Sequence, residues 1–299
     1  MKIGIDLGGS HIAVGIVNNE NEIIKKIEKN FTEEEKKNII PALEEYLVDE
    51  INKIKEEYKV EMIGIAIPGA AKDGIILKTV NLGINNYDIA SVLKNVIDVP
   101  VTVRNDGKCA CLAEYNNLLS KGEITKETNM LLLTIGTGIG GGVIYNGKLL
   151  QGKQFDGFEM GHMVIKADGL PCKCGNKGCF EKYGSIVEHK RKLEHRFNID
   201  YNISGDELRE LMKQEPQKIA DLEEEYVSDL SLGISNLVNI FEPDVIVLGG
   251  GFSHYRHIYV DRIKERLLNS SLLFNKRDDI DIRIAELGND AGMIGASME

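Results

Sequence analysis

Two strand–glycine–strand segments limit the folds open to this chain more than any other feature of its sequence. The first spans Lys2 to Asn18 and turns at Gly8-Gly9-Ser10, and the second spans Met130 to Leu150 and turns at Gly136 to Gly142. Apolar runs on either side of a glycine-rich turn are typical of β-hairpins. Because the same hairpin opens each half of the chain, we expect a duplicated α/β domain with a cleft between the halves.

The segments around the hairpins alternate between strand and helix patterns. Apolar residues at three-to-four spacing predict a single helix over Thr32 to Tyr58, and Ser204 is expected to cap a later helix. The return strand of the second hairpin is expected over Val143 to Leu150, after a turn that uses all the glycines.

A polar stretch from Leu118 to Glu127 marks the expected boundary between the halves. It gives a smaller domain of residues 1–120 and a larger domain of residues 121–288. The last segment, 289–299, is rich in small residues that allow close packing, and we assign it to the smaller domain.

The hairpin tips also suit phosphate binding. A tip without side-chain bulk exposes successive backbone N–H groups, and Asp6 stands at a strand end where a carboxylate can hold Mg2+ through water. Gly249-Gly250-Gly251 follows a short apolar strand, so the next helix can begin close to a ligand. Taken alone, a glycine hairpin is more often only a tight turn.

A compact group of metal-binding residue types lies between Glu159 and Glu181. It comprises one imidazole and three thiols: His162, Cys172, Cys174 and Cys179. Three thiolates and one imidazole complete a tetrahedral shell, which predicts a closed, structural zinc site. A reduced solvated loop would also explain the cluster, as would a disulfide with a spare thiol; the disulfide fits poorly with the absence of a secretory signal pattern.

Polar residues that suit sugar phosphorylation lie at predicted strand ends and beside the cysteines. Asp106 alone is most simply a helix N-cap, but in this setting it is also a general-base candidate for a hydroxyl that attacks a γ-phosphate. Surface charge is the simpler explanation of the two flanking glutamates, yet both border the zinc ligands. The hydroxyl-binding set is then Asn81, Asn105, Asp106, Glu159 and Glu181.

The charge and hydropathy of the 299-residue chain exclude several classes of function. The formal net charge of −11 is spread along the chain and opposes nucleic-acid binding, which needs a basic surface. No apolar run approaches the ~20 residues that span a bilayer. We expect a cytoplasmic protein with reduced thiols and no membrane or nucleic-acid partner.

Together these motifs resemble the ROK (repressor, ORF, kinase) family of sugar kinases over essentially the whole chain. The C-x-C-G-x-x-G-C-x-E segment at 172–181, after Glu159-x-Gly161-His162, is the most specific of them. The other matching segments are D-L-G-G-S at 6–10, Pro68-Gly69, Asn81-Leu82, Asn105-Asp106, Leu133 to Gly142, Gly249 to Gly251, and 287–296. Ser10 replaces the usual Thr and keeps the hydroxyl.

The resemblance implies an actin-like, ribonuclease H-like two-domain ATPase fold with ATP and a hexose in the cleft. It implies Asp106 as the base, structural Zn2+ on the four ligands, and His162 in contact with zinc and sugar through its two ring nitrogens. The implied sugar contacts are Gly69, Asn81, Asn105, Asp106, Glu159, His162 and Glu181. The implied ATP and Mg2+ contacts are Asp6, Gly8, Gly9, Ser10, His11, Gly136, Thr137, Gly138 and Gly250.

The resemblance ranks glucose first, phosphorylated at the 6-hydroxyl, and a homodimer as the default assembly. Fructose, N-acetylmannosamine and β-glucosides stay open, because loop geometry reads the orientation of a single hydroxyl. A non-catalytic sugar sensor on the same fold is the rival hypothesis; it would be expected to lose Asp106 or a hairpin, and this chain keeps both.

Overall fold

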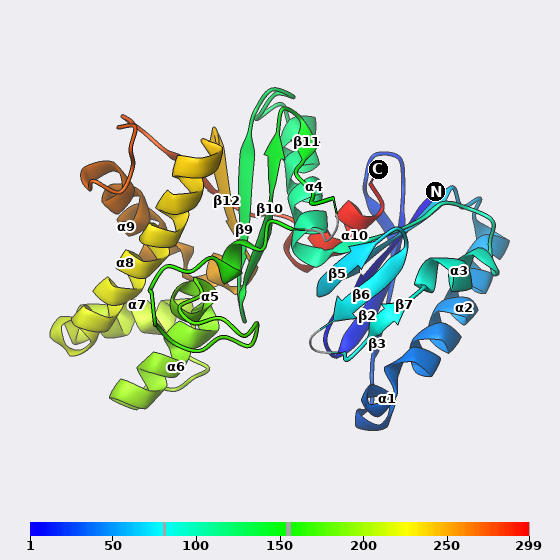
Figure 1. Cartoon of the computed structure of the whole chain (residues 1–299), viewed down its shortest axis with the longest axis horizontal. Helices are drawn as coiled ribbons and strands as arrows, with labels where there is room; N and C mark the ends of the chain where they lie inside the picture. The colour runs from blue at the N-terminus through cyan, green and yellow to red at the C-terminus, as the bar shows by residue number, and fades with distance from the viewer. Residues whose placement is uncertain (80–81, 154–156, 299) are drawn as a thin grey trace. The chain divides into compact units, whose positions relative to one another are not determined.

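The computed structural model describes residues 1–79, 82–153 and 157–298, which form two compact units (Figure 1). Unit 1 comprises Met1–Glu123, Leu149–Phe158 and Asn289–Glu299, and unit 2 comprises Ile124–Lys148 and Glu159–Gly288. Within the described residues, no helix combines the length and hydropathy that a bilayer span requires.

Unit 1 is built on a five-stranded mixed sheet in the order β3-β2-β1-β4-β8. Its strands are β1 (Lys2–Leu7), β2 (His11–Val17), β3 (Ile23–Asn30), β4 (Met62–Ile67) and β8 (Val101–Asn105). The first three pair antiparallel, which confirms the first hairpin, while β1, β4 and β8 run parallel. The carboxyl ends of these three strands therefore meet at one edge. A smaller antiparallel sheet follows, made of β5 (Gly69–Lys72), β6 (Ile75–Thr79) and β7 (Asn85–Tyr87).

Helices cover both faces of the main sheet of unit 1. On one face, α2 (Ile39–Glu57) and α3 (Ile89–Lys94) share a core with the strands, preceded by the short α1 (Glu33–Lys37). The prediction of a single helix over Thr32 to Tyr58 is wrong, because the helical conformation is interrupted at Asn38. Pro41 lacks an N–H and its ring excludes the carbonyl four residues earlier, so a new helix starts just before it.

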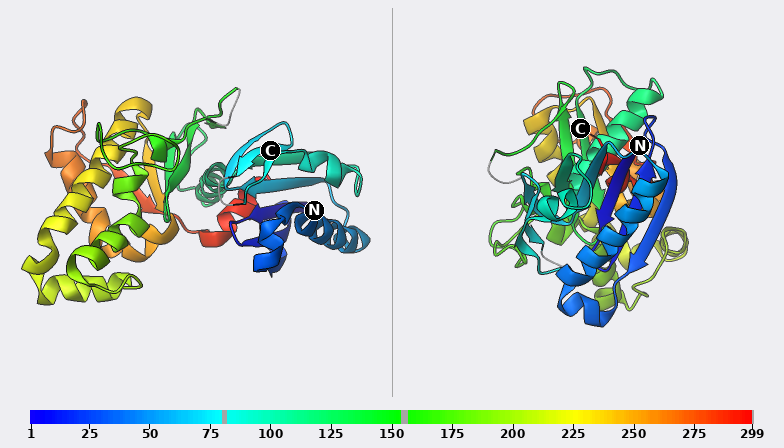
Figure 2. Two further views of the ribbon diagram at one scale, coloured as in Figure 1. Left: turned by 60° about the horizontal axis from the view of Figure 1, so that its bottom comes forward. Right: turned by 90° about the vertical axis from the view of Figure 1, so that its right-hand side faces the viewer.

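The other face of the unit 1 sheet carries α4 (Asp106–Ser120) and α10 (Ala291–Ala296), the latter preceded by the 3-10 turn η3 (Gly288–Asp290). The red C-terminal helix lies beside the blue N-terminal strands in Figure 2. Glycines allow this approach: a Cβ at Gly64 would lie 1.7 Å from the Ala296 carbonyl oxygen, and one at Gly4 would lie 2.2 Å from that of Met293.

Unit 2 repeats the strand plan of unit 1 in its own sheet, ordered β11-β10-β9-β12-β13. The strands are β9 (Met130–Ile135), β10 (Ile139–Tyr145), β11 (Lys148–Leu149), β12 (Val245–Gly249) and β13 (Asp281–Ile284). In each unit the first strand pairs antiparallel with the second and parallel with the fourth, and the fifth is parallel at the end. The expected duplication is confirmed by this shared topology.

The turn of the second hairpin is shorter than predicted. The return strand begins at Ile139 rather than Val143, and Gly140 to Gly142 lie inside it. Glycine is required there because a Cβ at Gly141 (φ +147°) would lie 2.0 Å from the Leu132 carbonyl oxygen. These glycines thus serve strand pairing, and only residues 136–138 form the tip.

The helices of unit 2 gather around one long member, α8 (Pro216–Phe241) (Figure 1). The others are η1 (Met160–His162), α5 (Glu181–Gly184), α6 (Ile186–Phe197), α7 (Gly205–Gln214), η2 (Gly250–Tyr255) and α9 (Arg256–Asn269). Ser204 caps α7 as predicted, and Glu207 closes a capping box with it.

Candidate functional site

The parallel strands of unit 1 bring two carboxylates to the same edge of the sheet. Asp6 lies near the end of β1, and Asp106 follows the end of β8 as the first residue of α4. The cap of α4 is Asn105, whose Oδ1 accepts from the Lys108 backbone N–H at 3.3 Å. The N-cap explanation of Asp106 is therefore wrong. Its Oδ1 accepts from the Gly107 N–H at 2.8 Å, which orients the carboxylate.

The carboxyl pKa of Asp6 is strongly perturbed. Burial raises the pKa of its carboxyl to about 7; the Asp106 charge adds to the rise, Lys26 opposes it, and Asp290 adds a smaller part. Lys26 Nζ lies 2.8 Å from Asp290 Oδ1. A carboxyl held near neutrality by burial and like charge has a high affinity for a cation, which is the environment that a Mg2+-binding acid needs.

Asp6 also contacts a residue that sequence reasoning missed. A Cβ at Gly292, in α10, would lie 3.3 Å from the Asp6 carboxyl carbon, so the carboxylate packs closely against this glycine. Asp290 and Lys26 were missed as well, since 264 residues separate them. The small-residue composition of 289–299 and the family-like segment at 287–296 were the available signals.

The first hairpin and the Pro68-Gly69 segment flank these acids. The Gly8 N–H donates to the His11 carbonyl at 2.9 Å, and a Cβ at Gly8 would lie 2.6 Å from the His11 ring, so the imidazole covers this glycine. Gly9 and Ser10 are exposed at the tip. Asn105 Nδ2 donates to the Gly69 carbonyl at 3.1 Å and ties the end of β8 to the start of β5. Asn81 lies outside the described residues.

In unit 2 the second hairpin tip meets the starts of α6 and η2. The Gly136 N–H donates to the Gly138 carbonyl at 3.0 Å, and the Gly136 carbonyl accepts from the Val187 N–H at 3.2 Å. Thr137 is exposed at the tip. Gly250 has φ +70°, and a Cβ on it would lie 3.0 Å from the Ile135 carbonyl oxygen. The expected nucleotide residues of this unit are thus neighbours.

The predicted zinc ligands come together in unit 2. The ligand atoms of His162, Cys172, Cys174 and Cys179 all lie within 4.8 Å of one another. The sulfurs of Cys174 and Cys179 are 3.6 Å apart, and Cys172 Sγ is 3.7 Å from His162 Nδ1. Zinc–sulfur bonds of about 2.3 Å at tetrahedral angles place sulfurs about 3.8 Å apart, so the four groups fit a zinc ion.

The three thiols differ in how the protein environment shifts their pKa values. Burial raises the pKa of the Cys172 thiol to about 12, and the Glu181 carboxylate adds to the rise against a backbone hydrogen bond that lowers it. A backbone hydrogen bond lowers the pKa of Cys174, whereas burial raises that of Cys179. Bound zinc would hold the ligating sulfurs as thiolates.

Glu181 joins this ligand cluster to the hairpin tip. Its Oε1 lies 3.0 Å from Cys172 Sγ and 3.7 Å from His162 Nδ1. On its other side, a Cβ at Gly138 would lie 2.6 Å from Glu181 Oε2. Glu159 is exposed at the start of η1, and its carbonyl accepts from the His162 N–H at 3.0 Å. One carboxylate thus stands between the metal cluster and the tip expected to hold phosphate.

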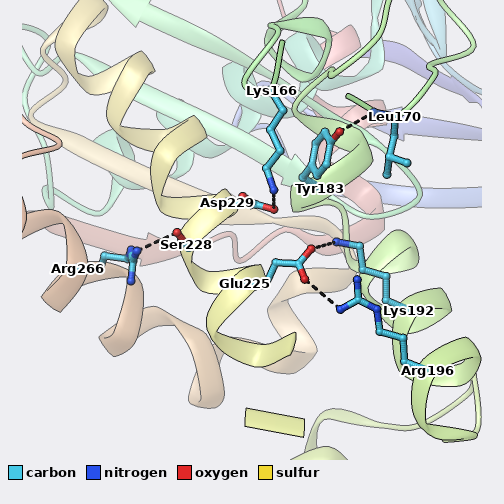
Figure 3. A network of polar contacts seen from close by, with 9 residues as sticks. All are labelled: Lys166, Leu170, Tyr183, Lys192, Arg196, Glu225, Ser228, Asp229 and Arg266. Atoms are coloured by element: carbon cyan, nitrogen blue, oxygen red, sulfur yellow. Dashed lines mark hydrogen bonds and ion pairs between the residues drawn. The ribbon is translucent and has the colours of Figure 1, made fainter. Parts of the chain in front are cut away.

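The loop that carries the cysteines is also anchored by protein contacts (Figure 3). Lys166 Nζ pairs with Asp229 of α8 at 2.7 Å, and the Leu170 N–H donates to the Tyr183 hydroxyl at 2.6 Å. Further polar contacts on α8 join Lys192 and Arg196 to Glu225, and Arg266 to Ser228. The position of this loop therefore depends on α8 and not on the ligand cluster alone.

Comparison with known proteins identifies the family. The ROK family model matches residues 2–298, so the chain belongs to the ROK family. A protein named glucokinase from Halalkalibacterium halodurans is 32% identical, over 98% of this chain and 92% of its own length. One named N-acetyl-D-glucosamine kinase from Vibrio cholerae is 29% identical, over 90% and 91%.

A solved structure agrees with the family assignment. The crystal structure of a ROK family glucokinase from Streptomyces griseus, in complex with glucose and AMPPNP, superposes with a TM-score of 0.73. It is 26% identical and covers 99% of this chain and 97% of its own. The fold is therefore the actin-like ATPase fold of the family, as the resemblance implied.

Proposed function

We propose that this chain is an ATP-dependent hexose kinase that phosphorylates glucose at the 6-hydroxyl, with Asp106 as general base. The observation that carries the proposal is the pair of carboxylates, Asp6 and Asp106, at one sheet edge of unit 1, with the cap of α4 supplied by Asn105. Phosphoryl transfer needs one acid to hold the cation and another to accept the hydroxyl proton.

The residues of the chain divide this work. Asp106 accepts the proton of the sugar hydroxyl and aims its oxygen, a role that contributes roughly 10²–10⁴-fold to rate. The N–H groups at the two glycine tips hold the ATP phosphates. Mg2+, when bound near Asp6, neutralises charge that develops on the phosphoryl group.

Sugar recognition is assigned in this proposal to polar groups of both units. Glu159, His162 and Glu181 accept or donate to hydroxyls from the zinc loop, and Asn105 and Gly69 contribute from unit 1. Zinc, when bound, fixes the loop; His162 Nδ1 faces the thiols and leaves Nε2 for the sugar. Asn81 is part of the same proposal.

Glucose is the first choice because proteins named glucokinase are among the relatives, but one named N-acetyl-D-glucosamine kinase is nearly as similar. Fructose, N-acetylmannosamine and β-glucosides are further candidate substrates. The rival function is a sugar sensor that binds hexose without turnover. We also propose that the protein is cytoplasmic and that it forms a homodimer. Light scattering after gel filtration measures the mass of the assembly and so tests the homodimer.

The experiment is a coupled ADP-release assay across these sugars, with wild type and Asp106→Asn. We expect glucose turnover and a kcat lowered by about 10²–10⁴-fold in the variant. The Kd for glucose, measured by calorimetry, should change far less, because the amide keeps a hydrogen bond to the sugar hydroxyl. Glu56→Gln, an exposed carboxyl on α2, is the matched control. Sugar binding without turnover would support the sensor, and full activity in Asp106→Asn would remove Asp106 as the base.

A further inference from the structure

Unit 1 contains a pocket of about 310 Å³ that none of the proposed catalytic or binding residues lines. Three segments enclose it: the strand β8 from Val101 to Arg104, the turn between β5 and β6 at Lys72 to Gly74, and the stretch from Gln151 to Lys153. Because β8 is the last strand of its sheet, its outer edge lines the pocket and offers backbone groups that no further strand of that sheet pairs.

The lining of the pocket is basic, although the chain as a whole is acidic. Lys72, Arg104 and Lys153 line it, opposed by the single acid Asp73, whereas the chain as a whole carries −11. In the described part of the chain, none of the three cations lies within 4.0 Å of a carboxylate, although most basic residues of α2, α6 and α9 have acidic partners. Three unneutralised cations in one small pocket attract an anion.

Hydrogen bonds tie two of the three segments that line the pocket to neighbouring parts of unit 1. Arg104 Nη1 donates to the Met298 carbonyl at 2.7 Å, which fixes the guanidinium. The Gly74 carbonyl accepts from the Ala90 N–H at 3.2 Å, so the turn is tied to α3.

We propose that this pocket binds a small phosphomonoester, and that its occupancy lowers turnover. Arg and Lys side chains together with strand N–H groups match the several acceptor oxygens of a phosphate. The volume suits a single small molecule and not a polymer. Arg104 precedes Asn105, the last residue of β8, and Asp106 follows at the start of α4, so an anion held by Arg104 acts on the strand that positions the proposed base. In this last step the inference rests on the proposed function, whose hexose 6-phosphate product belongs to this class.

Calorimetry with inorganic phosphate and with glucose 6-phosphate tests the site, in protein saturated with glucose and a non-hydrolysable ATP analogue. We compare wild type with Lys72→Gln/Lys153→Gln; both side chains are exposed, so this variant should fold. We expect the double variant to bind about tenfold more weakly or worse, as the loss of charged hydrogen bonds implies. Lys94→Gln, an exposed lysine on α3 away from the pocket, should bind like wild type.

The outcomes are distinct. Tighter binding of glucose 6-phosphate than of inorganic phosphate assigns the site to sugar phosphates, and equal binding assigns it to the phosphate group alone. No binding to wild type, or equal binding by wild type and the double variant, overturns the proposal.

Kinetics give a second measurement. Product inhibition should contain a component that glucose does not relieve, and the double variant should lose it while keeping its basal kcat. The calorimetry does not require turnover. A chain that binds phosphate here but phosphorylates no hexose would therefore refute the proposed function and leave this site standing.

Discussion

The proton affinity of Asp6 makes a quantitative prediction about stability. Burial, the Asp106 charge and Asp290 raise the pKa of this carboxyl in the folded protein from 3.8 to about 7, against the opposing effect of Lys26. Between these two pH values the folded state holds a proton that the unfolded state has released. The free energy of unfolding must then fall as pH rises, by about 1.4 kcal/mol per pH unit. Over about three units the cost reaches about 4 kcal/mol, and it is constant above the folded pKa.

Asp6→Asn removes this cost because an amide of the same shape does not ionise. We expect the variant's free energy of unfolding, relative to wild type, to be constant below about pH 4, to rise by about 4 kcal/mol between about pH 4 and 7, and to level off above that. Urea unfolding followed by circular dichroism, without Mg2+ or nucleotide, measures the difference at each pH.

Two further measurements sharpen this test. Asp290→Asn should move the midpoint of the rise to lower pH, since it removes one raising charge and frees Lys26, while Glu56→Gln should leave the profile as in wild type. Adding Mg2+ and nucleotide near neutral pH should release a proton from wild type but not from Asp6→Asn, measured by calorimetry in buffers of different ionisation enthalpy. A flat difference across the range from about pH 4.5 to 7.5 would refute the reasoning, because Asp6 would then ionise like an exposed carboxyl.

Three other predictions rest on close contacts. Removing zinc with a chelator should raise the Kd for glucose about tenfold, by releasing charged hydrogen-bond partners of the sugar, as calorimetry would measure; unchanged affinity would contradict the role of the loop. Gly138→Ala should weaken glucose binding by pushing Glu181 aside, whereas Gly136→Ala, whose Cβ would meet nothing closer than 3.9 Å, should not. Gly64→Ala should lower unfolding free energy by about 3 kcal/mol through its clash with Ala296, and a Tm indistinguishable from that of wild type would refute this.

The sequence predicted features whose cause is local. Glycine-rich tips between apolar runs predicted both hairpins, which the structure contains. The spacing of the cysteines predicted a ligand cluster, and the fold brings those residues together. The Ser204 cap depends on a serine with a glutamate three residues later. In each case the interacting residues are neighbours along the chain or belong to a motif with its own chemistry.

Features that depend on distant packing escaped prediction. Gly140 to Gly142 were assigned to a turn because their composition suits one, but they lie in a strand for lack of room above Leu132. The Asp6 environment depends on Lys26 and Asp290, which only the return of the chain to unit 1 brings together. The basic pocket likewise joins a turn, an edge strand and a distant loop.

The two contacts of Glu181 couple the loop that carries the predicted zinc ligands to the tip of the second hairpin. Its Oε1 lies at Cys172 Sγ, its Oε2 lies against Gly138, and a Cβ at Gly161 would lie 2.0 Å from the Ile139 carbonyl oxygen. With no space between loop and hairpin, a shift of the loop must move the hairpin tip. Metal loss should therefore weaken nucleotide binding as well as sugar binding, even though no predicted zinc ligand is a nucleotide contact. If chelation changed the Kd for glucose and left that for ATP untouched, Glu181 would serve the sugar alone and the hairpin would be held by its strands.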